Sequence, residues 1–457
     1  MIRNLKNIFL YTFTSFFAKS FAVLIIPLIA HNLSVEEYGN YIIIISIIML
    51  VQSIYLFGFE HSLNYYFNKF KSNLNKKILV STQLLFILLI CFITFIPIIL
   101  FFNSKIENLN LILLWGFLSV LLAYFSSLLK VDMQASTFAK SQIVQSIVLL
   151  LTIYVLLNFN CLNIQGIIFA NILSITLSLV FMSFFIKKYI LFNFNFNLLK
   201  KILHYGLPLM PAAIILWGST QLDRYYILYF LNEYVLGIYG FAISIGMIAM
   251  LLKTAFKSAI DPFIMNSYHI KSLHTKKYIS IFFTLSLYIF AFLFLTVSIF
   301  SDEIVLLIGG KKYLESVSYI PWVLFIVSIT TINQYFIYGI NFKRTNKLIL
   351  KGLLFMLVIN ITLAYLLINI LDIYGIIISN LFANIVYSTY LYNQSNKLYP
   401  IKYYTGVNIF IVFTALSCLL MNNMYLQDIP KIFIICIFVL LNVKVYAIAK
   451  GLLNESN

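Results

Sequence analysis

The stretch that decides the fold is Ser34–Ile47, SVEEYGNYIIIISI, because the chain returns to it 198 residues later. The second copy is Asn232–Ile245, NEYVLGIYGFAISI. Gly39 and Gly237 begin the same Gly-x-Tyr motif, and each motif opens a long apolar run. A match at such a distance indicates an internal repeat.

A second pair of matching stretches supports the repeat. Residues 162–174 read LNIQGIIFANILS and residues 371–383 read LDIYGIIISNLFA, so Asn171 corresponds to Asn380 at an offset of 209. The two matches have similar offsets and occur in the same order along the chain. Together they indicate two halves related by duplication.

Composition places this repeat in a membrane. Hydrophobic residues make up 62% of the 457 residues and charged residues only 10%, whereas about 25% of the residues in ordinary soluble domains are charged. Apolar runs of about 20 residues, the length of a membrane-spanning helix, recur from end to end. We predict fourteen spans, at residues 8–30, 40–62, 78–102, 109–129, 141–158, 163–186, 205–230, 235–260, 278–300, 317–341, 347–370, 373–395, 404–422 and 432–449.

The repeat and the spans together predict the architecture. The offset covers six predicted spans, an even number, so both halves have the same orientation in the membrane. We expect an all-α integral membrane protein of about 14 transmembrane helices. It would have a six-helix lobe at residues 1–200, a pseudo-symmetric six-helix lobe at 201–400, and helices 13 and 14 with a tail at 401–457. Two lobes around a cleft are typical of a transporter that works by alternating access, and a channel is the alternative.

The distribution of positive charge predicts the orientation. Of the 31 Lys and Arg residues, 25 lie in the termini and the alternate loops on one side of the spans, and four lie on the opposite side. By the positive-inside rule, both termini are then cytoplasmic. The first span is too long for a signal peptide and lacks a small-residue cleavage site. The net charge of +17 orients the protein and meets anionic membrane lipid, so we expect no nucleic-acid partner.

The sequence carries no pattern that indicates catalysis. The GGKK run at residues 309–312 lacks the spacing of a phosphate-binding Walker loop, and the four cysteines lack metal-ligand spacing. We therefore expect no enzyme activity, no cofactor and no metal. Transport would be driven by an H+ or Na+ gradient, by a substrate gradient or by consumption of the product. A membrane glycosyltransferase or polymerase is the enzyme alternative, and it would need a large outside loop.

Three segments resemble the polysaccharide-exporter family. Residues 207–263, which contain LPLMPAAIILWGSTQLDRYYILYF, resemble its central signature: a glycine–leucine–proline entry, an Asp-Arg pair late in span 7, a Gly-x-Tyr motif opening span 8 and a proline after that span. Residues 26–67 and 306–324 are similar to its first two spans and to its loop between spans 9 and 10. The resemblance covers nearly the whole chain. The family includes the Wzx-type O-antigen and capsule flippases.

The resemblance implies a substrate and a location. It implies that the chain moves an undecaprenyl-pyrophosphate-linked oligosaccharide, an O-antigen or capsule repeat unit, across the bacterial cytoplasmic (inner) membrane. The sugar and pyrophosphate would enter the cleft while the polyprenyl tail stays in lipid. A glycan polymerase and chain-length proteins are the partners it suggests. The superfamily also holds lipid II flippases and multidrug/cation antiporters, and both are alternative functions.

Charges inside the spans are the candidate site, because a charge at mid-bilayer costs about 2.5–3.5 kcal/mol and is seldom kept without a partner or a cavity. Asp223 and Arg224 lie side by side within Trp217–Phe230, WGSTQLDRYYILYF. The guanidinium fork of Arg224 suits a phosphate oxygen, and Asp223 would orient it or carry a coupling proton. The alternative is that both residues bond to neighbouring helices and stabilise the lobe.

Four further charges are candidate contacts to the substrate or to a gate. Lys19 lies near the middle of the first span and resembles the basic residue that lipid II flippases carry there. Lys253, Lys257 and Asp261 follow one another at four-residue spacing near the cytoplasmic end of span 8. The two lysines would capture the pyrophosphate. Alternatively, they extend to the membrane interface and Asp261 pairs with Lys257.

The second span offers a matching pair. Glu60 and His61 lie near the same depth as the lysines of span 8. They would close a gate or carry a coupling ion. Asn333, Gln334 and Asn360 are uncharged candidates for the cleft, although hydrogen bonds between helices explain them equally well.

Overall fold

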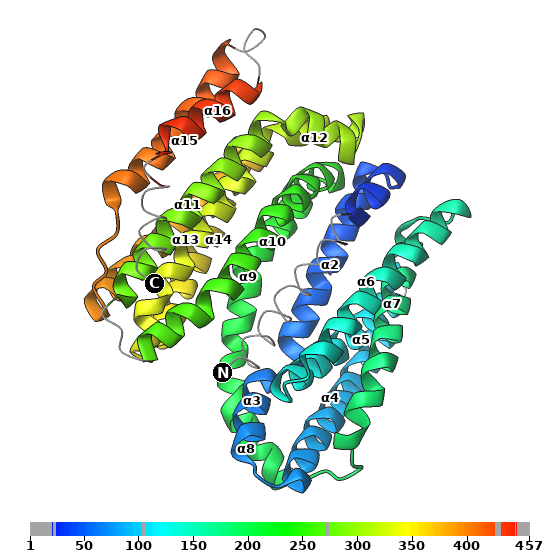
Figure 1. Ribbon diagram of the computed structural model, residues 1–457. Helices are drawn as coiled ribbons and strands as arrows, with labels where there is room; N and C mark the ends of the chain where they lie inside the picture. Colours follow the sequence, from blue (N-terminus) through cyan, green and yellow to red (C-terminus); the bar gives the residue numbers. More distant parts are fainter. Residues whose placement is uncertain are drawn as a thin grey trace. The chain divides into compact units, whose positions relative to one another are not determined.

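The computed structural model of the chain describes residues 21, 24–102, 107–269, 274–425, 431–443 and 445 (Figure 1). Helices account for most of these residues, and no strand occurs among them. Ten of the described helices are long and apolar enough to cross a membrane. The prediction of an all-α, multi-pass membrane protein is therefore confirmed, whereas the count of fourteen spans stays a prediction. The predicted span at 8–30 lies mostly outside the described residues.

Contacts between residues divide the chain into two compact units, Met1–Leu222 and Asp223–Asn457. The first unit contains α2 (Val35–Tyr55), α3 (Phe59–Lys69), α4 (Asn73–Phe102), α5 (Leu109–Val131), α6 (Ala135–Asn158), α7 (Ile164–Ile186), η1 (Lys187–Tyr189), α8 (Phe196–Gly206), η2 (Leu207–Leu209) and the start of α9 (Met210–Phe230). The second contains the rest of α9, α10 (Glu233–His269), α11 (Thr275–Ile299), α12 (Ser301–Ile308), η3 (Lys311–Ser318), α13 (Ile320–Phe342), α14 (Lys347–Leu398), α15 (Thr405–Tyr425) and α16 (Lys431–Leu441).

The repeated stretches specify where helices begin. At the start of α2, the Ser34 Oγ accepts a hydrogen bond from the backbone N of Glu37 at 3.1 Å, and the Ser34 N donates to the Glu37 Oε2 at 2.8 Å. This capping box satisfies two backbone donors that the first turn would otherwise leave unbonded. Asn232 caps α10 at the matching position, where its Oδ1 accepts from the Val235 N at 2.8 Å. Asn163 caps α7 in the same way.

The last of the four repeated stretches, residues 371–383, begins at a break inside α14. This helix extends over 52 residues, but Asp372 has a φ of 48° and interrupts it. Asp372 corresponds to Asn163 in the repeat, and its ψ of −129° is also far from the helical value. The break separates the predicted spans at 347–370 and 373–395.

The predicted span at 40–62 is wrong at its C-terminal end. The helix α2 ends at Tyr55, Gly58 has a left-handed backbone with a φ of 66°, and α3 follows as a separate helix. Glu60 and His61 therefore lie in the first turn of α3, and both are exposed. The boundary was missed because apolar residues continue through the break and hide it from hydropathy.

Two glycines let the backbone of this break touch another part of the first unit. A Cβ atom on Gly58 would lie 2.3 Å from the backbone oxygen of Gly206, at the end of α8. A Cβ atom on Gly206 would lie 2.7 Å from the backbone oxygen of Phe57. Both distances are shorter than real Cβ contacts, and the obstacle in each case is backbone. The packing of α3 beside α8 therefore depends on both glycines.

We expect Gly58→Ala to destabilise the protein by about 2 kcal/mol or more, because alanine adds both a left-handed backbone penalty and a steric clash. Thermal unfolding of the purified protein in detergent would measure this loss. The matched control is Gly406→Ala, because a Cβ atom there meets nothing within 4 Å. Equal melting temperatures for the two variants would show that the close approach does not support the fold.

The last two described helices pack against α11 in the second unit (Figure 1). The Thr284 Oγ1 on α11 donates to the Asn408 Oδ1 on α15 at 2.8 Å. At the start of α16, the Lys431 Nζ lies 2.6 Å from the Glu303 Oε1 on α12. The hydrogen bond from Lys431 holds the pKa of Glu303 below its usual range. These contacts make α15 and α16 part of the second unit.

Candidate functional site

The Asp223 carboxylate is buried, and three donors satisfy it. The Asp223 side chain is 8% exposed. Its Oδ2 accepts from the Tyr239 hydroxyl at 2.8 Å and from the Asn380 Nδ2 at 3.5 Å. Its Oδ1 accepts from the backbone N of Arg224 at 2.9 Å. A buried carboxylate needs such donors to offset the loss of water, and here they come from α9, α10 and α14.

A chain of amide and hydroxyl groups extends this cluster along α14. The Asn360 Nδ2 donates to the Asn380 Oδ1 at 3.0 Å, and the Ser379 Oγ donates to the Asn360 Oδ1 at 3.1 Å. Asn360 precedes the break at Asp372, whereas Ser379 and Asn380 follow it. The buried network therefore connects both segments of α14 to α9. Asn360 was predicted either to line the cleft or to form a hydrogen bond between helices, and it forms such a bond between the two segments of α14.

The partners of Asp223 come from the repeated motifs. Tyr239 belongs to the Gly-x-Tyr motif of α10, and Asn380 corresponds to Asn171 in the first half. Within its described residues, the first unit does not reproduce the cluster, because the Asn171 Nδ2 bonds to a backbone oxygen of its own helix, Ile167 O, at 2.9 Å. Sequence reasoning missed Tyr239 and Asn380 as site residues, although the repeat had already singled them out.

Arg224 differs from its neighbour. Its side chain is only 3% exposed, and its Nε and Nη1 are buried without a hydrogen-bond partner among the described residues. Arginine keeps its charge in proteins and carries five donors in a fixed fork. The Asp223 oxygens already accept three hydrogen bonds from other donors. Two nitrogens of the guanidinium therefore have no acceptor within the described part of the chain.

Two of the three predicted residues of α10 form hydrogen bonds to α13. The Lys253 Nζ donates to the Thr330 Oγ1 at 2.8 Å, and the Asp261 carboxylate accepts from the Tyr338 hydroxyl. The second pair lies eight residues after the first on both helices. The helices α10 and α13 are therefore parallel, and their polar residues are aligned. Lys257 occupies the middle of this row, with its Nζ 3.9 Å from the Asp261 Oδ2. That pair is half-exposed, so it contributes little to stability.

The remaining predicted residues fall into three groups. Asn333 and Gln334 on α13 are buried, and the Asn333 Oδ1 and Gln334 Oε1 lack a partner among the described residues. Glu60 and His61 lie on the exposed surface of α3. Lys19 lies outside the described residues. The described part of the chain contains no group of three or more His, Cys, Asp or Glu residues that could hold a metal ion.

A comparison with family models matches residues 28–318 to the family described as "Polysaccharide biosynthesis protein". A comparison with curated protein sequences gives no match. Among solved structures, a lipid II flippase, MurJ, in an inward closed conformation has a TM-score of 0.76 at 14% identity, over 98% of this chain and 99% of that chain.

Multidrug transporters also share the fold. An inward-facing MATE family transporter of the MOP superfamily has a TM-score of 0.67 at 14% identity, over 83% of this chain and 95% of that chain. A MATE transporter from Vibrio cholerae has a TM-score of 0.60 at 14% identity, over 86% and 96% of the two chains. At such identities these similarities show that the chain shares the fold of these transporters, and they leave the substrate open.

Proposed function

The chain belongs to the polysaccharide biosynthesis protein family, whose model matches more than half of its length, and from this membership we propose that it is a lipid-linked oligosaccharide flippase. It would carry an undecaprenyl-pyrophosphate-linked repeat unit of O-antigen or capsule across the cytoplasmic membrane by alternating access. The family supports a role in glycan assembly. The fold shared with a lipid II flippase supports a substrate that carries a lipid and a diphosphate.

The observation that carries the proposal is the buried guanidinium of Arg224. A buried charge without hydrogen bonds is costly. The Nε and Nη1 of Arg224 have no acceptor among the residues that the structure describes, and this favours a ligand that supplies acceptors. A diphosphate does so with several oxygens, and arginine binds phosphate in a bidentate geometry. Asp223 would orient the guanidinium, and with its Tyr239 and Asn380 partners it is the group we assign to coupling with H+ or Na+.

The other predicted residues take roles along the same path. Lys253 and Lys257 would meet the diphosphate near the cytoplasmic end of α10, and Lys19 would hold it deeper. Asp261, with Glu60 and His61 on α3, would serve in gating or coupling. In this proposal both termini are cytoplasmic, as the positive-inside distribution of Lys and Arg favours.

Deletion of the gene tests the function. We expect a deletion strain to lose its surface polysaccharide and to accumulate the lipid-linked repeat unit on the cytoplasmic side of the membrane. A plasmid copy of the wild-type chain should restore the polysaccharide. The accumulated lipid would be measured by extraction and mass spectrometry. Unchanged surface polysaccharide in the deletion strain would contradict the proposal.

The similarity to MATE transporters favours multidrug/cation antiport as the second candidate. That function predicts that the deletion strain becomes more sensitive to cationic drugs and keeps its surface polysaccharide. Lipid II flipping is the third candidate function, and it predicts that this chain rescues cells depleted of their own lipid II flippase. The three functions therefore give different results in one set of strains.

A further inference from the structure

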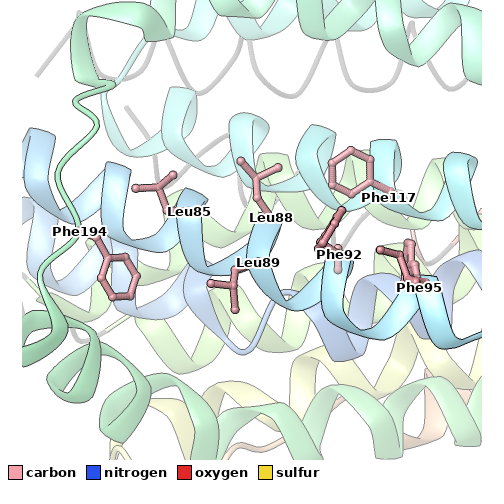
Figure 2. Close-up of a pocket in the computed structure, with 9 residues that line it drawn as sticks. Leu85, Leu88, Leu89, Phe92, Phe95, Phe117 and Phe194 are labelled. Atoms are coloured by element: carbon pink, nitrogen blue, oxygen red, sulfur yellow. The ribbon is translucent and has the colours of Figure 1, made fainter.

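The first unit carries an apolar groove that the proposed function has not used. Seven side chains of α4 between Leu85 and Ile96 line it, together with Phe117 of α5 and Phe194 of the segment before α8 (Figure 2). Its volume is about 760 Å³. On an α-helix, the distance from Leu85 to Ile96 is about 16 Å. The groove is therefore a long trough along one membrane-spanning helix.

One end of the groove is built by a connector that hydrogen bonds hold on α4. The backbone N of Leu191 donates to the Ser81 Oγ at 2.7 Å, and the backbone N of Asn195 donates to the Thr82 Oγ1 at 3.2 Å. Ser81 and Thr82 are buried. These two bonds flank Phe194, which lies beside Leu85 in Figure 2. The end of the groove is thus a fixed part of the structure.

Positive charge gathers at the same end. Lys77, at the start of α4, is eight residues from Leu85, about 12 Å along the helix. The segments on either side of Phe194 carry Lys187, Lys188, Lys200 and Lys201, and Lys188 forms an ion pair with Asp132 at 3.0 Å. Residues 78–102 of α4 and residues 109–129 of α5 contain no charged side chain. The groove thus combines a long apolar wall with a group of lysines near one end, whereas a single lysine, Lys105, follows the other end in the sequence. This asymmetry matches an anionic lipid.

We propose that this groove holds the polyprenyl chain of the lipid-linked substrate, with the diphosphate directed to the lysines. The inference rests on the proposed function. A diphosphate carries more negative charge than the single phosphodiester of a membrane phospholipid, so it gains more from several lysines. Four phenylalanine rings, at positions 92, 95, 117 and 194, and branched leucine and isoleucine side chains line the trough. They leave space for a methyl-branched chain.

The position of the groove gives this binding a consequence. Phe194 belongs to the connector between α7 and α8, and α8 leads through η2 into α9, which carries Arg224. A polyprenyl chain against Phe194 would therefore contact the segment that continues into the helix of the candidate site.

Binding of undecaprenyl diphosphate without sugar to the purified full-length protein tests the inference. The variant Leu89→Trp fills the groove, and the control Leu151→Trp places the same side chain on α6, outside it. Leu89 and Leu151 are similarly exposed, at 51% and 54%. We expect Leu89→Trp to weaken binding about tenfold, because the tryptophan displaces apolar contact area. Leu151→Trp should bind like the wild type, and phosphatidylglycerol at equal mole fraction should not displace the probe.

Two outcomes would overturn the inference: unchanged binding by Leu89→Trp, or displacement of the probe by equal phosphatidylglycerol, which would assign the groove to bulk lipid. A melting temperature equal to that of the wild type would show that Leu89→Trp is folded, and Phe194→Ala provides a second variant of the same groove. The binding assay contains no sugar and no transport step. If the groove variants bind the probe like the wild type but deletion of the gene still removes the surface polysaccharide, the groove inference is wrong and the proposed function stands.

Discussion

Arg224→Ala will reach the membrane in normal amounts and will lose nearly all transport of the lipid-linked oligosaccharide. In the proposed function, Arg224 and the diphosphate form a buried, hydrogen-bonded charge pair. Removing one partner of such a pair costs about 2–5 kcal/mol, which corresponds to a loss of at least about thirtyfold in affinity or rate. Arg224→Lys will recover only a small part, because an ammonium lacks the bidentate fork. Surface polysaccharide in the complemented deletion strain would measure both variants.

The stability of the same variant separates a substrate contact from a structural one. Without substrate, the Nε and Nη1 of Arg224 make no hydrogen bond within the described residues, and Asp223 keeps its three donors after the substitution. Because Asp223 loses its attraction to Arg224 but keeps these three hydrogen bonds, we expect Arg224→Ala to lose less unfolding free energy than Asp223→Ala. Arg344→Ala, at an exposed position, is the matched control and should leave transport unchanged. A strongly destabilised Arg224→Ala protein would instead favour the structural role.

Asp223→Ala will have the opposite profile, a large loss of stability. The substitution removes the acceptor of the Tyr239 hydroxyl, and it removes the electrostatic attraction between Asp223 and Arg224. It leaves the Arg224 charge buried, and an uncompensated buried charge costs about 3–5 kcal/mol. We expect a correspondingly lower melting temperature in detergent.

Three further variants make this prediction specific. Asp223→Asn keeps the shape and one acceptor oxygen, so it should lose less stability than Asp223→Ala. Tyr239→Phe removes one hydrogen bond between helices and should cost about 1 kcal/mol. Asp223→Ala combined with Arg224→Ala should regain part of the loss, because no buried charge then remains at the pair. A melting temperature of Asp223→Ala equal to that of the wild type would refute this account of the cluster.

Much of the fold could be read from local sequence patterns. Long apolar runs predicted the all-α membrane class, and the repeated stretches at Ser34, Asn163 and Asn232 mark the observed starts of α2, α7 and α10. The break between α2 and α3 was missed, since hydropathy averages over a window and no charge interrupts the run there. It depends on the contact between Gly58 and Gly206, which are far apart in the sequence.

The sequence identified only part of the candidate site. The rule that membrane charges need a partner singled out Asp223 and Arg224, but it could not say which of them already has partners. Asn380 lies 157 residues from Asp223, and no periodicity reports a hydrogen bond over that separation. The same limit applies to Lys253 and Thr330, which lie 77 residues apart.

Flipping by the purified protein in lipid vesicles tests the central claim most directly. Vesicles would contain the lipid-linked oligosaccharide in both leaflets, and a membrane-impermeant glycosidase would cleave the sugar exposed outside. With the wild-type chain, we predict that cleavage continues until nearly all the substrate is consumed. With Arg224→Ala, it should stop at the fraction seen in protein-free vesicles. Cleavage by the wild type that stops at the protein-free fraction, or a variant as fast as the wild type, would contradict the account.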